Sequence, residues 1–210
     1  PAKAVGVPGS WGNEKAAYQA AWDALPDPVT DLDAAKKLVA ESGVSNPELV
    51  IAAWSELPDS VNQALVLQQA ANSVGFNATI NKIGFDRAAD LYSGAKKEDI
   101  DIFATNYLSF ISDPLYIYSQ IGLEAGSANW GGYSNAKVSE LVTSALATTD
   151  DAERAKITIE IQSLLVADYA WLPTTTSPTP FFISNELSGV VPTGPAHLWS
   201  AWAVNLGTAK

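Results

Sequence analysis

Cysteine is absent from the 210-residue sequence, and histidine occurs once, as His197. Without cysteine the chain forms neither a disulfide nor a thiolate metal site. One histidine is too few for a zinc or nickel site built from side chains alone. A Ser-His-Asp triad would need that same histidine, and no Gly-x-Ser-x-Gly elbow or Gly-rich phosphate loop is present. We therefore expect no metal, no cofactor and no nucleophilic enzyme.

Positive charge is also scarce, with 12 Lys and Arg against 23 Asp and Glu, a formal net charge of −11. Such a surface repels phosphate backbones, so we expect no nucleic-acid partner, and we attribute the acidity to solubility. Long apolar runs are missing too, since the stretch Leu49–Trp54 is far too short to span a bilayer. No signal peptide precedes Pro1, which suggests a processed protein or a piece of a longer one.

Apolar residues nevertheless make up 47% of the chain, enough for a sizeable core. Glu48–Trp54 has the pattern of a short strand, a helical spacing of apolar residues follows it up to Gly75, and Phe76–Lys82 alternates like a second strand. Asp99–Asn106 resembles a third. A strand–helix–strand unit of this size predicts parallel neighbours. We predict an α/β fold with a mixed sheet and helices on both faces.

Amphipathic patterns and turn residues predict further elements. Helices are expected at Pro114–Gly122, Asn135–Leu146 and Asp151–Ala167. Strands interrupted by prolines are expected at Trp171–Thr175 and Thr179–Ser184.

Aromatic residues are concentrated after the third predicted strand. The rings between positions 107 and 133 are Tyr107, Phe110, Tyr116, Tyr118, Trp130 and Tyr133. Ligands of α/β proteins bind beyond the carboxyl ends of parallel strands, and rings beside amides suit a polar organic ligand. A long loop packed on its own rings is an equally good explanation.

Neighbouring acidic residues leave a second class of function open. Asp31 and Asp33, the group Glu98, Asp99 and Asp101, and the pair Asp150 and Asp151 could serve a carboxylate-pair hydrolase. All of them lie at predicted helix starts or turns, where solvation and the helix dipole explain them. A third alternative is a structural or adhesive module without a small ligand, which an exposed apolar patch would favour.

Several motifs occur in an order found in one known family. They are Phe85-Asp86, Asp99-Ile100-Asp101-Ile102, Asn106-Tyr107 through Asp113-Pro114, Tyr133-Ser134-Asn135, and Glu153-Arg154 through Pro173. Together they resemble the extracellular solute-binding proteins of peptide/nickel ABC importers, family 5, over nearly the whole chain. Family members are more than twice this long. The resemblance therefore implies the C-terminal ligand-binding lobe at residues 1–184 and a tail, residues 185–210, that completes the first lobe.

The resemblance also implies a function. We expect a type II periplasmic-binding-protein lobe, not an enzyme, that holds a peptide-like or oligosaccharide-like solute between two lobes and delivers it to an ABC permease in the membrane. The expected location is periplasmic or extracellular, either membrane-anchored as a lipoprotein or free.

The expected ligand-binding residues follow from the same comparison. They are Asn106, Tyr107, Phe110, Asp113, Asn129 and Trp130. Tyr107 stands where the family has a tryptophan, and Phe110 stands where peptide-binding members have the aspartate that pairs with the ligand α-amine. A phenyl ring cannot neutralise a buried ammonium. The ligand is thus expected to be uncharged or differently charged, such as a capped or hydrophobic peptide or an oligosaccharide, in competition with an ordinary peptide.

Overall fold

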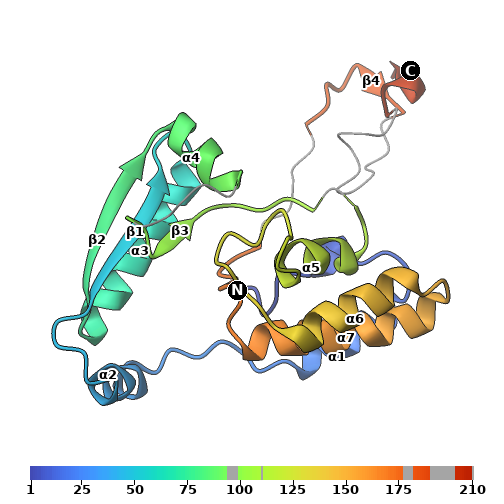
Figure 1. Ribbon diagram of the computed structural model, residues 1–210. Helices are drawn as coiled ribbons and strands as arrows, with labels where there is room; N and C mark the ends of the chain where they lie inside the picture. Colours follow the sequence, from blue (N-terminus) through green and yellow to red (C-terminus); the bar gives the residue numbers. More distant parts are fainter. Residues whose placement is uncertain (94–98, 110, 177–181, 190–201, 210) are drawn as a thin grey trace. The chain divides into compact units, whose positions relative to one another are not determined.

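The computed structural model describes residues 1–93, 99–109, 111–176, 182–189 and 202–209 (Figure 1). The chain divides into two compact units. We call Val29–Tyr107 the sheet unit, and Pro1–Pro28 together with Leu108–Lys210 the helical unit. The chain therefore passes from one unit to the other after Pro28 and returns after Tyr107.

Three parallel strands form the sheet unit, with β1 (Glu48–Trp54) between β2 (Asn77–Ile83) and β3 (Ile102–Ala104). The α/β class and the pairing of these neighbours are confirmed. The described sheet is entirely parallel, which corrects the expected mixed sheet: the β1–β2 and β2–β3 connections both contain a crossover helix, which returns each strand in the same direction.

The third strand is shorter than predicted. The Val50 N–H donates a hydrogen bond to the Asp101 carboxylate, with 2.7 Å between nitrogen and oxygen. The Asp101 N–H in turn donates to the Val50 carbonyl. A side chain thus replaces the backbone acceptor at this point, and regular pairing begins only at Ile102.

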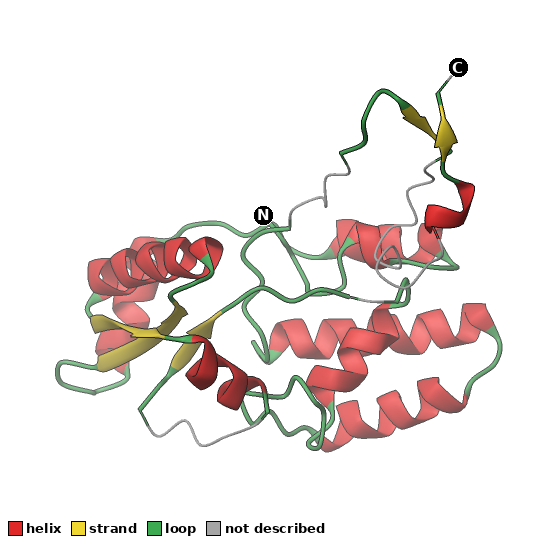
Figure 2. Ribbon diagram, turned by 90° about the horizontal axis from the view of Figure 1, so that it is seen from above, coloured by secondary structure: helices red, strands yellow, loops and turns green. Residues whose placement is uncertain are grey.

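Helices cover both faces of the sheet, as predicted (Figure 2). Successive side chains of a strand point to opposite faces. Ile51 and Ala53 of β1 therefore pack with Ala64 of α3 (Pro58–Val74), whereas Ala52 packs with Ala88 of α4 (Phe85–Tyr92). The small side chains on β1 allow the helices to lie close to the sheet. A further helix, α2 (Leu32–Glu41), contacts α3.

The helical unit is built on α5 (Pro114–Gly122), α6 (Ala136–Ala147) and α7 (Asp151–Ala167). The predicted bounds of α5 and α7 are confirmed, and α6 begins and ends one residue later than predicted. A short loop joins α6 to α7, which lie side by side in both ribbon views. The side chains of Val142, Ile161 and Tyr118 are almost fully buried between these helices.

The N-terminal segment belongs to the same unit. It contains a short 3-10 helix, η1 (Pro8–Ser10), and α1 (Lys15–Ala24), which contacts α7. The ring of Trp11 stacks on Tyr18 at 6.3 Å and meets the edge of Trp22 at 6.2 Å. This aromatic cluster fixes an otherwise irregular segment on the helices.

The predicted strand Trp171–Thr175 is wrong. The stretch forms no strand, although the Thr174 carbonyl accepts one hydrogen bond from Ala2 at 3.1 Å. Pro173 lacks an N–H and interrupts any ladder there. The first part of the predicted strand Thr179–Ser184 lies outside the described residues, and residues 182–184 form no strand.

The described part of the tail forms a small antiparallel pair between β4 (Leu187–Ser188) and β5 (Gly207–Thr208), with a 3-10 turn, η3 (Trp202–Asn205), before β5. Within the described ranges, no helix has the length and hydrophobicity needed to cross a bilayer.

Candidate functional site

The carboxyl ends of the three parallel strands bring together residues of different chemistry. Trp54 ends β1, and Phe85 follows the end of β2 after a single glycine. Asn106 and Tyr107 follow the end of β3. This edge is where α/β proteins place their ligands, because backbone polar groups and loop side chains converge there. We call it the carboxyl edge.

Aromatic rings form a row at the carboxyl edge. Trp54 lies 5.9 Å from the Phe85 ring and 6.2 Å from the Tyr92 ring, and Tyr92 lies 5.5 Å from Phe103. The hydroxyl of Tyr92 is hydrogen-bonded to that of Thr105. Phe85 is 61% exposed, which is high for a phenyl ring that also rests on an indole. The row therefore presents apolar surface that an organic solute can cover.

The indole N–H of Trp54 is shielded from solvent and has no acceptor among the described residues. A buried donor without a partner costs free energy, and such donors are rare in folded proteins.

Glu56 places a negative charge at the carboxyl edge. The Ser55 hydroxyl donates to its carboxylate at 2.7 Å, and this bond is the main reason why the pKa of Glu56 is lowered. The backbone N–H of Phe85, at the start of α4, and the nearby Trp54 indole contribute less. The indole lies close enough to lower the pKa without reaching hydrogen-bonding geometry. The carboxyl is thus held in its charged form beside the exposed ring of Phe85.

Asn106, a predicted ligand residue, is held by the first turns of α3. Its amide N–H donates to Asp59 at 3.3 Å, and its carbonyl accepts from Gln63 at 2.8 Å. Tyr107 is half-buried at the end of the sheet unit. Phe110 lies outside the described residues.

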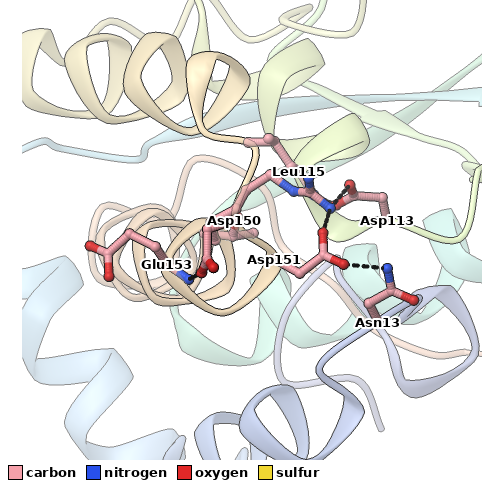
Figure 3. A network of polar contacts seen from close by, with 8 residues as sticks. Asn13, Asp113, Leu115, Asp150, Asp151 and Glu153 are labelled. Atoms are coloured by element: carbon pink, nitrogen blue, oxygen red, sulfur yellow. Dashed lines mark hydrogen bonds and ion pairs between the residues drawn. The ribbon is translucent and has the colours of Figure 1, made fainter.

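Asp113, Asn129 and Trp130 lie in the helical unit. Asp113 caps α5 by accepting the Leu115 N–H at 2.9 Å. Asn129 accepts from the Tyr133 N–H at 2.7 Å and donates to the carbonyls of Leu123 and Tyr133 at 3.0 and 2.7 Å. Asn129 thus uses its polar atoms to shape its own loop, whereas Asp113 caps α5 (Figure 3) and also lies 3.6 Å from Arg154 of α7.

Trp130 forms a ring pair with Trp171 at 5.3 Å and donates its indole N–H to Ser127 at 3.0 Å. No local pattern links these two rings, because they come from segments on either side of α6 and α7.

The structure brings only some of the six predicted residues together. Asn106 and Tyr107 are neighbours at the carboxyl edge. Asp113 begins α5, whereas Asn129 binds the carbonyl of Leu123 beyond its last turn. These two lie at opposite ends of a nine-residue helix, which is about 13 Å long. A ligand role for the six residues stays a prediction.

Trp54, Glu56 and Phe85 were missed by the sequence analysis. Their positions in the sequence were informative, because each of these three residues ends or closely follows a predicted strand, just as Tyr107 does. Ligands of α/β proteins bind beyond the carboxyl ends of parallel strands, and this rule points to the ends of the first two strands as well as to the third.

The acidic groups that suggested a hydrolase have structural partners. Asp31 caps α2 and Asp150 caps α7, each by accepting a backbone N–H, and Asp99 forms an ion pair with Arg87 at 2.8 Å. Glu98 lies outside the described residues. No group of three or more His, Asp or Glu side chains in the described part of the chain could hold a metal ion.

Comparison with known proteins adds to this geometry. Residues 1–129 match the family model described as bacterial extracellular solute-binding proteins, family 5, middle region. No curated protein matches the chain significantly.

Three solved structures share the fold. NikA of Staphylococcus aureus, in complex with Ni(L-His)2, is 22% identical with a TM-score of 0.61, over 69% of this chain and 32% of that one. AppA of Clostridium difficile, a putative peptide-binding protein, is 22% identical with a TM-score of 0.67, over 86% and 37%. DppA of Helicobacter pylori, in complex with the peptide STSA, is 21% identical with a TM-score of 0.60, over 73% and 30%. The chain thus spans about a third of the length of these proteins.

Proposed function

Because this chain belongs to the family 5 bacterial extracellular solute-binding proteins, we propose that it is the solute-gripping lobe of such a protein. In this proposal the carboxyl edge forms one wall of the solute site. The lobe covers residues 1–184, and the tail, residues 185–210, completes the other lobe. The two-lobed protein would close over a solute and deliver it to an ABC permease in the membrane.

The observation that carries the proposal is the composition of the carboxyl edge. The exposed ring of Phe85, resting on Trp54, offers apolar contact area, while Glu56 and Asn106 offer polar groups beside it. A small number of fixed polar groups within an aromatic surface is typical of sites for organic solutes.

A peptide-like solute fits this edge best. A peptide offers apolar side chains for the rings and backbone carbonyls for a donor such as the exposed Asn106 amide. DppA holds a peptide and NikA holds a nickel–histidine complex, which supports a peptide or a metal–amino acid complex as the solute class. An oligosaccharide also suits aromatic surfaces, but none of these three relatives is named for one.

Binding without chemistry is part of the proposal. The family consists of binding proteins, and Asp31, Asp99 and Asp150 are used for caps and an ion pair instead of facing a substrate. The family is extracellular, so we propose a periplasmic or extracellular location, with the protein either lipid-anchored or free.

Calorimetry with the peptide STSA and its N-acetylated twin tests the solute class. Phe110 stands where relatives place an ammonium-pairing acid, so removing the α-amine charge is expected to weaken binding less than about tenfold, or 1.4 kcal/mol. A loss above about 2 kcal/mol, the scale of a buried charged hydrogen bond, would contradict it. Ni(L-His)2 serves as the third titrant. If the protein binds this complex and neither peptide, the proposed solute class changes from a peptide to a metal–amino acid complex.

A further inference from the structure

Side chains of α3 fix the end of β3 within the sheet unit. The buried Ser60 hydroxyl donates to the Ala104 carbonyl, which holds the main chain just before Asn106. The side chains of Asp59 and Gln63 both bind the Asn106 amide, at 3.3 and 2.8 Å. Residues four positions apart lie on the same face of a helix. One face of α3 therefore contacts both polar atoms of the Asn106 side chain.

These two contacts fix which way round the Asn106 amide lies. An ionised carboxylate only accepts hydrogen bonds, so Asp59 must face the amide nitrogen of Asn106. The amide oxygen then faces Gln63, whose nitrogen donates to it. Gln63 alone would not decide the orientation, because its own amide can turn to offer either a donor or an acceptor. Asp59 is therefore the residue that determines it.

The orientation determines what Asn106 can offer a solute. A side-chain amide carries two N–H donors and an oxygen with two lone pairs. Among the described residues, Asp59 uses one N–H and Gln63 uses one lone pair. One donor and one acceptor remain, in a fixed order, on an exposed side chain.

An extended peptide matches this remaining pair. The N–H and the carbonyl of one residue in an extended strand point to the same side, where a neighbouring strand exchanges two hydrogen bonds with them. A fixed donor and a fixed acceptor can bond both groups at once. A sugar hydroxyl, in contrast, can donate or accept, so an oligosaccharide would gain nothing from a fixed amide orientation.

We propose that Asn106 binds the main chain of an extended peptide through its remaining donor and acceptor, and that Asp59 is the positioning residue that fixes their order. This rests on the proposed function, because it concerns the carboxyl edge as a solute site. It narrows the solute class from peptide-like solutes to those with a peptide main chain. It also gives Asp59, which needs no contact with the solute, a role in specificity.

The side-chain NH2 signal of Asn106 in the ¹⁵N-labelled chain tests the positioning without a solute, and the variant Asn106→Ser identifies this signal. A hydrogen bond to a carboxylate moves the donated proton to lower field, and Asp59→Asn is expected to remove that displacement. Asp33→Asn is the matched control, because Asp33 and Asp59 both lie in the first turn of a helix and interact with its dipole. An unchanged Asn106 signal in Asp59→Asn would overturn the positioning role.

Exchanging the two α3 side chains tests whether the orientation matters to the solute. In the double variant Asp59→Asn/Gln63→Glu the carboxylate lies on the other side of Asn106, so the amide is again fixed but turned round, and the net charge is kept. Affinity for the peptide STSA is expected to fall about fivefold in Asp59→Asn and to stay low in the double variant. Recovery of affinity in the double variant would overturn the proposal.

Esters of STSA, in which oxygen replaces one peptide N–H at a time, test the contact with the peptide main chain. In the unmodified chain one of these esters is expected to bind about fivefold more weakly than STSA, and in Asp59→Asn the same change should cost less than about twofold. An equal loss in both proteins would contradict the pairing with Asn106. If the unmodified chain binds neither STSA nor Ni(L-His)2, the proposed function and the peptide contact both fail, whereas the NH2 signal still decides whether Asp59 orients Asn106.

Discussion

Ser60 joins the carboxyl ends of two strands through its side chain. Its hydroxyl accepts from the Trp54 N–H at 2.9 Å and donates to the Ala104 carbonyl, and the residue is fully buried. Both strand ends carry residues of the proposed solute site, so one small polar side chain sets the geometry of the carboxyl edge. At residue scale, the site depends on groups that never need to touch the solute.

Ser60→Ala should destabilise the chain by about 2 kcal/mol, because it leaves a buried N–H and a buried carbonyl without partners. Urea unfolding measures the change. Ser73→Ala on the same helix is the control, since its hydroxyl is exposed and bonds only to its own helix at Ala70. A change no larger than that of Ser73→Ala would show that the Ser60 bridge is unimportant.

Tyr133 and Asp168 form a pH-sensitive pair. The Tyr133 hydroxyl donates to Asp168 at 2.6 Å. This bond, more than that of Asn135, lowers the pKa of Asp168, while partial burial and the same carboxylate raise the pKa of Tyr133 to about 12. The depressed carboxyl pKa gives stability that is lost as the pH falls below about 4. The raised phenol pKa gives stability that is lost as the pH rises from about 10 to 12.

Tyr133→Phe should remove the phenol effect and the larger contribution to the lowered pKa of Asp168, leaving only the Asn135 bond. The difference in unfolding free energy between the two proteins is expected to be constant from about pH 5 to 9 and to shrink toward both extremes. Urea titrations at a series of pH values measure this difference. A difference that stays constant down to pH 2 and up to pH 12 would contradict the pairing.

At the scale of elements, the sequence predicted helices well where a capping side chain precedes a long periodic pattern. Asn135 and Asp150 cap α6 and α7, and both starts were predicted within one residue. The prediction of a strand at Trp171–Thr175 was wrong because this apolar stretch has no partner strand in the described part of the chain. Strand pairing depends on long-range contacts that a local pattern cannot contain, and Pro173 removes one of the donors needed.

The contact between α5 and α6 depends on the absence of a side chain at Gly122. An added Cβ would lie 2.9 Å from Val138, which is fully buried. Gly122→Ala should therefore cost about 1–3 kcal/mol. Val138→Ala in the same chain makes room for the new methyl group, so the double variant should lose less than the sum of the two single variants. Thermal unfolding of the four proteins gives the coupling energy.

Gly131→Ala is the control for this cycle, since nothing lies within 4 Å of an added Cβ and the residue has an ordinary backbone conformation. Strict additivity of Gly122→Ala and Val138→Ala would show that the two helices do not meet at this point.

At the scale of the whole molecule, the division into two units could not be read from the sequence. The helical unit combines Pro1–Pro28 with Leu108–Lys210, and only tertiary contacts such as those of Gly12 with Ser112 join them. The carboxyl edge was predicted in part, at Asn106 and Tyr107. Trp54 and Phe85 also lie at strand ends. Their contact depends on the strand order β2-β1-β3, because this order determines which strand ends are neighbours.

The central claim is that the carboxyl edge of the sheet unit forms a wall of the solute site. Titration of the ¹⁵N-labelled chain with the peptide STSA tests it by NMR, with the Trp54 indole N–H signal identified through the variant Trp54→Phe. We expect the Trp54 indole and the amides of Phe85 and Asn106 to shift progressively and to saturate at millimolar peptide, since one lobe alone gives weak binding. Shifts confined to the helical unit, or none with either STSA or Ni(L-His)2, would contradict the account.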